Sequence, residues 1–250
     1  MAPPLRPNGA LRYDAVRRGL QLANCEPRSI LEIGCGVGAL ATKLAELGDY
    51  VGLEPDEASF ELARARLDGS RAAEIRNARF EDLDQSERFD LVCAFEVLEH
   101  MENDVAELTA WTSRVAPNGL LMVSVPAYQH RFSEYDEYVG HYRRYEPAQL
   151  AALLREVGLE DVRVMHWGFP FSYAVEYANL RIVRRQLSKR AGHGSMHERT
   201  AASGRFRTVP DAVGSIATAF VWPFRIAQRR FPTRGPGLLA FGRMSEARAS

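Results

Sequence analysis

The amino-acid sequence predicts an α/β protein with a doubly wound, mostly parallel sheet of seven strands and helices on both faces. The last strand is expected to be antiparallel, with a helical insertion before it. Three observations predict this fold class. Short runs rich in Val, Ile and Leu alternate with segments of helical periodicity, the connections are short, and a glycine-rich turn follows the first apolar run. This alternation is typical of a parallel sheet covered on both faces.

The first half of the chain shows the alternation most clearly. Apolar residues at helical spacing predict helices over 11–24, 37–47 and 57–67. Continuous apolar runs predict strands over 29–35, 50–53, 74–80 and 89–95. Gly48 follows the second of these helices and acts as its stop signal.

The second half continues the alternation and then departs from it. A helix over 102–115 is followed by strand 120–125, helix 147–157 and strand 162–167, while 127–145 has no clean period. Helices are expected over 170–190 and 212–231, the latter interrupted at Pro223, with a loose polar connector over 188–209 and a last strand over 238–243. The predicted domains are a helical cap (1–28), a core (29–168), an insertion or lid (169–234) and the last strand with its tail (235–250).

Composition sets broad limits on function. The 250 residues are 46% hydrophobic and 26% charged with a formal net charge of +0, which gives no reason to expect a nucleic-acid partner. Three scattered cysteines (Cys25, Cys35 and Cys93) indicate a reducing compartment rather than disulfides or a zinc cluster. The N-terminus lacks the apolar core of a signal peptide, so we expect a cytoplasmic protein.

The segment LEIGCGVG (31–38) is the most informative stretch. A glycine-rich turn between a strand and a helix lets a ligand approach the backbone closely, but this pattern alone also fits a dinucleotide site or a plain tight turn. Glu32 sits where a pyrophosphate site would favour an uncharged turn, and Glu54 ends the next strand, where an acid accepts hydrogen bonds from ribose hydroxyls. These two acids favour a nucleoside with an ammonium group and no pyrophosphate, such as S-adenosylmethionine, over NAD.

Four segments in order, ILEIGCGVG, VGLEPD, FDLVCAFEVLEHM and LLMVSVPA, resemble the motif series of class I S-adenosylmethionine-dependent methyltransferases, which have a Rossmann-like fold. The resemblance covers about residues 28–168. It implies S-adenosylmethionine as the cofactor, with Glu32 holding the ammonium group and Glu54 bridging the ribose hydroxyls. The implied cofactor-binding residues are Tyr13, Glu32, Gly34, Cys35, Gly36, Gly38, Glu54, Pro55, Phe80, Glu81 and Phe95.

Some of these roles have alternatives. Glu81 or Asp82 would meet the adenine amine beside the backbone of Phe80, although many family members carry an acid where this chain has Arg79. Tyr13 would close over the cofactor carboxylate or would simply pack as a half-buried tyrosine.

The segment Glu96-Val97-Leu98-Glu99-His100 is a candidate catalytic or metal-binding cluster. Spacings of three and four residues bring two carboxylates and an imidazole together, and such groups bind a divalent ion such as Mg²⁺ or leave His100 as a general base. The segment is similar to the E-x-x-E-H run of the ubiquinone-pathway O-methyltransferases. We therefore expect Glu96, Glu99 and His100 as metal ligands, and Glu96 and His100 among the catalytic residues. The alternative is that these residues only shape the turn.

A second group of functional side chains lies in the run YDEYVGHYRRY (135–145), which resembles a bacterial subgroup of these enzymes. His141 is the candidate base there. The candidate acceptor-binding residues are Tyr138, Tyr142, Arg143 and Arg144. The alternative is that the aromatic residues pack on the sheet while the arginines pair with Asp136 and Glu137.

The late segment 181–234 is basic, with 12 of the 32 lysines and arginines but only two of the 32 acids, Glu198 and Asp211. Aromatic residues accompany the arginines, which favours a lid shared across a homodimer, a face for a membrane or lipid, or a solvated helix pair. The predicted function is methyl transfer to a small molecule, at a hydroxyl oxygen. The alternatives are a lipid, glycan or cell-envelope acceptor, N-methylation of an amine, a tRNA-binding protein and an NAD-dependent oxidoreductase.

Overall fold

A computed structural model describes residues 5–70, 72–187 and 214–245, and the side chains of 214–220 are excluded. Its centre is a seven-stranded sheet of order β3-β2-β1-β4-β5-β7-β6. The strands are β1 (Ser29–Ile33), β2 (Asp49–Leu53), β3 (Ala73–Arg76), β4 (Phe89–Phe95), β5 (Val115–Pro126), β6 (Leu159–Trp167) and β7 (Gly237–Met244). β7 pairs antiparallel with both β5 and β6, whereas β1 to β5 are parallel. The predicted fold class is confirmed.

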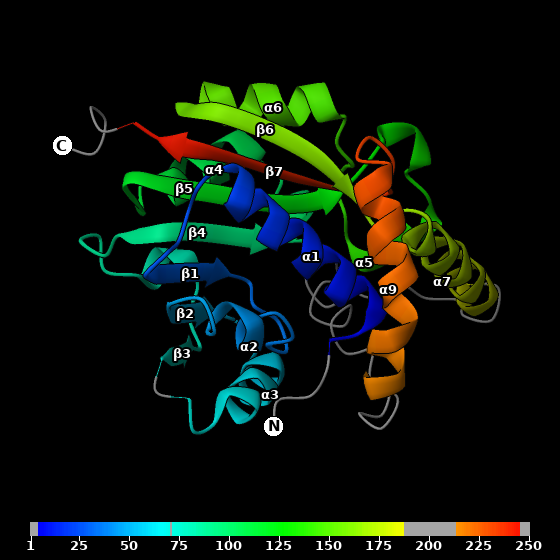
Figure 1. The fold of residues 1–250 in the computed structure, drawn as a ribbon, viewed down its shortest axis with the longest axis horizontal. Coiled ribbons are helices and arrows are strands. Elements are labelled where there is room, and N and C mark those ends of the chain that lie inside the picture. Colours follow the sequence, from blue (N-terminus) through cyan, green and yellow to red (C-terminus); the bar gives the residue numbers. More distant parts are fainter. Residues whose placement is uncertain (1–4, 71, 188–213, 246–250) are drawn as a thin grey trace.

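Helices cover both faces of the sheet (Figure 1). They are α1 (Pro7–Leu22), α2 (Ala41–Leu44), α3 (Glu57–Leu67), α4 (Asp104–Thr112), α5 (Glu134–Val139), α6 (Pro147–Glu156), α7 (Phe171–Leu187) and α9 (Gly214–Arg230). One hydrophobic cluster joins α4 and α6 to the sheet, and a second joins α1 and α2 to the opposite face. The arrowheads of β1, β4, β5 and β6 point toward the side where α5 and α7 lie (Figure 1), so this edge gathers the loops that follow parallel strands.

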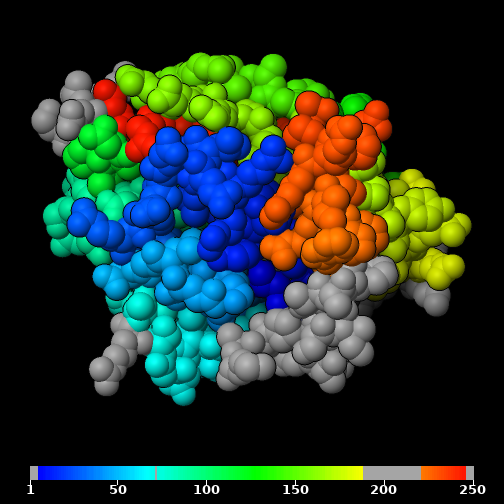
Figure 2. All heavy atoms as spheres, in the orientation of Figure 1, coloured from blue at the N-terminus to red at the C-terminus, as the bar shows by residue number. Residues whose placement is uncertain are grey.

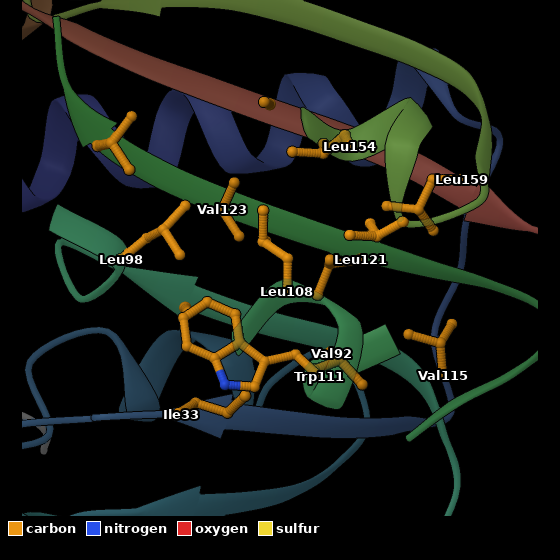
Figure 3. Close-up of a cluster of buried hydrophobic side chains, with 14 of the residues drawn as sticks. Ile33, Val92, Leu98, Leu108, Trp111, Val115, Leu121, Val123, Leu154 and Leu159 are labelled. Carbon is orange, nitrogen blue, oxygen red and sulfur yellow. The ribbon is translucent and has the colours of Figure 1, made fainter. Parts of the chain in front are cut away.

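In the larger cluster, the inner face of α4 is buried against the sheet. Figure 3 shows Leu108 and Trp111 from α4 with Val92 and Leu121 from the sheet. Trp111 is 1% exposed and Leu108 is 0% exposed. Burial of one such leucine side chain stabilises the fold by about 2 kcal/mol, so this face anchors the strands whose ends carry the candidate site.

Helix α9 of the insertion is tied to α1, and the two lie side by side at the surface (Figure 2). Asp14 of α1 is 2% exposed and accepts hydrogen bonds from Gln228 (2.9 Å) and Arg225 (3.1 Å), and from the Arg229 Nε (3.0 Å). Burial raises the pKa of Asp14, but the hydrogen bonds from Arg229 and Gln228 outweigh it and leave the pKa below its ordinary value. The insertion is therefore fixed to the N-terminal helix.

Two predicted helices were wrong in detail. The helix predicted over 37–47 is reduced to α2 at Ala41–Leu44, and the left-handed backbone of Gly38 (φ +72°) excludes a helix that begins at residue 37. The interruption predicted at Pro223 does not occur, since α9 runs through it. Proline removes one backbone donor, and packing of the neighbouring Phe224 against Phe171 (5.2 Å between ring centroids) holds the helix in place.

The aperiodic stretch 127–145 also contains regular structure. A 3-10 turn, η3 (Gln129–Arg131), is followed by α5, which ends at Gly140 in the left-handed conformation (φ +85°). Six residues are too few to show a helical period, so the sequence pattern missed this helix. The connector predicted over 188–209 lies outside the described residues, and the division into domains stays a prediction.

Candidate functional site

The turn after β1 is shaped by three glycines with positive φ: Gly34 (+68°), Gly36 (+55°) and Gly38 (+72°). A Cβ on Gly38 would lie 2.9 Å from the Ala63 Cα of α3, so this glycine permits close packing. A Cβ on Gly36 would meet nothing within 4 Å. Gly36 therefore faces open space of the kind that a ligand lying against the backbone would fill.

Glu54 at the end of β2 is tied to this turn. Its carboxylate accepts hydrogen bonds from the backbone N–H of Gly36 (2.8 Å) and of Asp56 (2.9 Å), and burial raises its pKa. The Asn77 side chain donates to the Glu54 carbonyl oxygen at 3.0 Å and holds the turn from the other side. The predicted acid after the second strand thus lies directly beside Gly36.

Glu32 on β1 is 3% exposed and accepts a 2.5 Å hydrogen bond from the Tyr50 hydroxyl on β2. A Cβ on Gly52 would lie 2.6 Å from that hydroxyl, so Gly52 gives Tyr50 the room to reach Glu32. Burial raises the pKa of Glu32 to about 7, while the Tyr50 hydrogen bond and the nearby Arg12 charge oppose the rise. A carboxylate in this state favours a cationic ligand group, because a positive charge would stabilise its ionised form.

Tyr50 and Arg12 were missed by the sequence analysis. Arg12 on α1 lies with its guanidinium over the Trp167 ring (4.9 Å) and 3.7 Å from the Glu96 carboxylate. Its Nε is buried and has no hydrogen-bond partner in the described part of the chain. Its charge also acts on Glu32 and on Glu99. The available signal was the position of Arg12 on a predicted helix next to Tyr13, a residue already expected at the site.

The other predicted cofactor residues lie around this turn or near the end of β3. The Tyr13 hydroxyl donates to the Lys43 carbonyl oxygen (3.2 Å), and Cys35 is buried with its N–H donating to Leu53 (2.9 Å). Phe95 is 6% exposed at the end of β4. Pro55 and Glu81 are exposed, and Phe80 is half-buried in η1 (Phe80–Asp82) with the Arg114 guanidinium over its ring.

Glu96 follows β4 with φ +60°, an unusual conformation for a residue with a side chain. Its backbone N–H donates to the Ser124 carbonyl oxygen (2.8 Å), and the Ser124 hydroxyl donates to its carboxylate (2.7 Å). The carboxylate thus faces Arg12 and β5 at the end of the sheet.

Glu99 and His100 lie in the 3-10 turn η2 (Leu98–His100), where they meet His141 rather than Glu96. One ligand atom from each of the three side chains lies within 4.8 Å of the others. The His100 and His141 rings meet edge to face at 4.7 Å, and the His141 Nε2 is 3.8 Å from the Glu99 Oε1. Among the residues that the structure describes, neither oxygen of the fully buried Glu99 carboxylate has a hydrogen-bond partner, so both oxygens are available to bind a cation or a proton.

The electrostatics of the cluster follow from its burial. Desolvation, followed by repulsion from Glu96, raises the pKa of Glu99 well above its ordinary value. Desolvation and the neighbouring His141 lower the pKa of His100 to about 4, so its imidazole is neutral at pH 7. The Gly140 carbonyl oxygen accepts from the His100 Nδ1 (3.1 Å), which leaves Nε2 with a lone pair.

Two of the predicted acceptor-binding residues form ion pairs, and the two tyrosines differ in exposure. Arg144 is 4% exposed and pairs with Asp136 and Glu176, while Arg143 pairs with Asp104 (2.9 Å). Tyr142 is 41% exposed and Tyr138 is half-buried. The pairing of Arg144 with Asp136 matches one half of the packing alternative, while its second partner is Glu176 of α7 instead of Glu137.

A cavity of about 340 Å³ lies between η3, α5 and α7. Its walls combine aromatic rings (Tyr135, Tyr173 and Tyr177) with polar groups that include Arg131, Arg144 and Glu176. It is large enough for a small organic molecule. Its position beside α5 places it on the same edge of the sheet as His141.

Residues 9–164 match the family described as a methyltransferase domain. The chain belongs to the class I S-adenosylmethionine-dependent methyltransferases. A relative from Bradyrhizobium diazoefficiens, named ubiquinone biosynthesis O-methyltransferase, is 36% identical over 134 residues, which is 50% of this chain and 53% of that protein. The match therefore spans about half the length of this curated relative.

Solved structures agree on the fold. A sarcosine dimethylglycine methyltransferase from Galdieria sulphuraria aligns with a TM-score of 0.61 at 14% identity, over 95% of this chain and 87% of that one. N-methyltransferase NodS from Bradyrhizobium japonicum WM9, in complex with S-adenosyl-L-homocysteine, aligns with a TM-score of 0.56 at 16% identity, over 93% and 86%. At these identities the likeness shows the methyltransferase fold, and S-adenosylmethionine is the cofactor of the family.

Proposed function

We propose that this methyltransferase transfers a methyl group to a hydroxyl oxygen of a small-molecule acceptor, at the sheet edge between the glycine turn and α5. The observation that carries the proposal is the buried, unpartnered Glu99 carboxylate beside His100 and His141. An acceptor hydroxyl has a proton to lose, and an imidazole or a bound cation assists that loss. An amine acceptor needs less help, because its neutral form attacks without first losing a proton. The O-methyltransferase name of the Bradyrhizobium diazoefficiens relative supports the same choice.

The cofactor would lie along the turn after β1. Glu32 would hold its ammonium group, Arg12 its carboxylate and Glu54 its ribose hydroxyls, and the open space at Gly36 would receive the chain between them. Phe80 and Glu81 lie near the end of β3, where they would meet the adenine. The charges of Glu32 and Arg12 are opposite to those of the ammonium and carboxylate groups that they would hold, and the Glu54 carboxylate would accept hydrogen bonds from the neutral ribose hydroxyls.

When bound, S-adenosylmethionine supplies a methyl group on a positively charged sulfur, and an attacking oxygen forms a bond to that carbon as the carbon–sulfur bond breaks. The residues of this chain align the acceptor and accept its proton. The His141 Nδ1 is bonded to Asp136 at 2.9 Å, so Nε2 is the nitrogen that takes the proton from the hydroxyl. The electron pair of the broken bond stays on sulfur.

Glu99, His100 and His141 also fit a divalent cation. One ligand atom from each lies within 4.8 Å of the others, and the two Glu99 carboxylate oxygens have no hydrogen-bond partner among the described residues. Both histidines would use Nε2, since their Nδ1 atoms are bonded to Gly140 and Asp136. Two imidazoles and one carboxylate favour Zn²⁺ or another transition-metal ion over the Mg²⁺ suggested by the sequence. A bound cation would lower the pKa of the acceptor hydroxyl.

The test is a screen with labelled S-adenosylmethionine against phenols, catechols, aliphatic alcohols and amines, with S-adenosylhomocysteine formation measured for each. Methylated phenols or alcohols support the proposal, and methylation confined to amines contradicts it. His141→Ala is expected to lower turnover much more than cofactor affinity. The role of a cation is tested by chelation followed by readdition of single metal ions. If a cation is required, chelation abolishes turnover and one of the metals restores it. If His141 acts as a base without a metal, chelation leaves turnover unchanged.

A lipid-bearing acceptor is a second candidate, supported by the outer surface of α7 and α9. Large apolar side chains are exposed there: Tyr177 (60%), Ile182 (52%), Trp222 (64%) and Ile226 (48%). Arginines on the same two helices, among them Arg181, Arg184 and Arg230, would face anionic headgroups. Within the described ranges no helix is long and apolar enough to cross a membrane, so any contact would be with the surface.

Sedimentation with vesicles tests this face. Binding to phosphatidylglycerol vesicles that weakens in Trp222→Ser/Ile226→Ser, with phosphatidylcholine vesicles as the neutral control, supports the lipid candidate. Equal recovery in the supernatant with both vesicles removes it. Light scattering of the same variant measures its molecular mass and so tests for a homodimer in which residues 169–234 cover the partner's site.

A further inference from the structure

Asp136 of α5 is the centre of a buried hydrogen-bond network. The residue is 0% exposed, and its carboxylate accepts from the Ser133 N–H (2.9 Å) and hydroxyl (3.0 Å), and from the Arg144 Nε (2.8 Å) and Nη2 (3.0 Å). The same carboxylate is bonded to the His141 Nδ1 at 2.9 Å. Because an ionised carboxylate only accepts, the His141 proton lies on Nδ1, and Nε2 faces Glu99.

Glu176 extends this network into the insertion. It lies on α7, and its carboxylate binds the Arg144 Nη1 (3.0 Å) with one oxygen and the Arg131 Nη2 (2.6 Å) with the other. Arg144 is 4% exposed, so its buried guanidinium depends on both Asp136 and Glu176 for compensation. An unbroken chain of side-chain contacts therefore runs from α7 through Arg144 and Asp136 to His141.

We propose that Glu176, Arg144 and Asp136 are positioning residues that let the docking of α7 against α5 set the ring orientation and tautomer of His141. The bidentate pair with Arg144 fixes the plane of the Asp136 carboxylate, and that plane fixes the imidazole. With α7 displaced, Arg144 loses Glu176 and the carboxylate loses its fixed orientation. What His141 then does rests on the proposed function, but its positioning is a property of this chain alone.

The hydrogen-bond network also borders a cavity. Arg144 and Glu176 also line the cavity between α5 and α7. A molecule in that cavity would therefore contact the far end of the same chain of contacts. Through Glu176, the insertion acts on His141 by charge and hydrogen bonding.

The test uses Glu176→Gln, which keeps the shape of a side chain that is 24% exposed. Long-range ¹H–¹⁵N spectra of the full chain, with the His141 signals assigned by their loss in His141→Gln, report the tautomer without any acceptor. Wild type is expected to show one Nδ1–H tautomer, and Glu176→Gln a mixture. Turnover with an acceptor found in the screen is expected to fall about 10-fold at unchanged S-adenosylhomocysteine affinity.

The matched control is Arg184→Gln, which breaks the exposed pair between the same two helices, Arg184 with Glu134 (3.1 Å), without touching Asp136. Its His141 spectrum and turnover are expected to equal those of wild type. Asp136→Asn is expected to give the largest change in tautomer, and Arg144→Lys a partial one because it cannot bind both carboxylate oxygens. A single unchanged tautomer in Glu176→Gln overturns the proposal, even in an enzyme whose proposed acceptor class is correct.

A failure of the acceptor screen would remove the proposed function and leave the spectra unaffected. A change in the His141 spectrum of Arg184→Gln equal to that of Glu176→Gln would show that loosening α7 in any way is enough. That outcome contradicts a specific route through Arg144.

Discussion

The turn after β1 and the segment after β5 lie along the same edge of the sheet, but different kinds of bond hold them. At the turn, Glu54 accepts from the backbone N–H groups of Gly36 and Asp56. After β5, the side chains of Asp136, Arg144 and Glu176 bind one another. The first region depends on backbone conformation, and the second depends on charged side chains from α5, from the loop after it and from α7.

This difference indicates a division of labour. A site made from backbone groups and glycines is rigid and recognises a part of the ligand that never varies, as a cofactor does. A site made from paired side chains varies with the residues at those positions, as acceptor recognition requires. Substitutions in the two regions should therefore fail in different ways.

The largest effect is expected for Glu32→Gln, which removes the buried acid that would face the cofactor ammonium. The affinity for S-adenosylhomocysteine should fall about 100-fold, or about 3 kcal/mol. Isothermal titration calorimetry measures this loss. A change of less than about threefold would mean that Glu32 does not contact the ligand.

The same variant should change the pH dependence of stability. The ordinary pKa of a glutamate side chain is 4.5, whereas burial raises the pKa of Glu32 in the folded state to about 7. Between these values the folded state keeps a proton that the unfolded state has released, so the free energy of unfolding falls as pH rises, by about 3 kcal/mol in total. Urea unfolding of the ligand-free protein at pH 5 and 8 should show this fall in wild type and not in Glu32→Gln.

The next effect separates two glycines of the same turn. Gly38→Ala combines a strained φ with a Cβ 2.9 Å from the Ala63 Cα, and should lower the free energy of unfolding by about 3 kcal/mol. Gly36→Ala has the strain without the clash and should cost about 1 kcal/mol while weakening cofactor binding. Equal stability losses in the two variants would contradict the open space at Gly36.

A smaller loss is expected for Asp14→Ala, which frees α9 from α1. Two of its arginine partners reach solvent, with side chains 36% and 59% exposed, so they can be hydrated when the acid is lost. The free energy of unfolding should fall by about 2 kcal/mol. Hydrogen exchange should speed up in α9 and leave the β1 turn unchanged, and exchange that rises equally in both would show that the regions are not independent.

The smallest effect is expected for Arg143→Gln, which removes a half-buried pair with Asp104 and a hydrogen bond to the Glu102 carbonyl oxygen. The cost should be about 1 kcal/mol of stability with KM for the acceptor unchanged. An increase in acceptor KM without loss of stability would instead place Arg143 in acceptor binding, as its sequence position predicts.

Features that depend only on neighbouring residues could be predicted from the order of the amino acids. Strand–helix alternation specified the parallel sheet, and the spacing of Glu32, the glycines and Glu54 marked the cofactor edge. Both are local because strand periodicity and the positive φ of glycine act over a few residues. The six-residue helix α5 was not predicted, because it is shorter than two helical turns and shows no helical period in the sequence.

The pairing of the charged groups, in contrast, depends on how distant segments pack in the folded chain. Tyr50 reaches Glu32 from the next strand, Arg12 reaches Glu96 from the first helix, and His141 joins Glu99 from 42 positions away in place of the expected Glu96. The choice of Glu176 as the partner of Arg144 depended on how α7 docks on α5. Hydrogen bonds and ion pairs depend on distances of a few ångströms between side chains, and local sequence patterns carry no information about such distances across the chain.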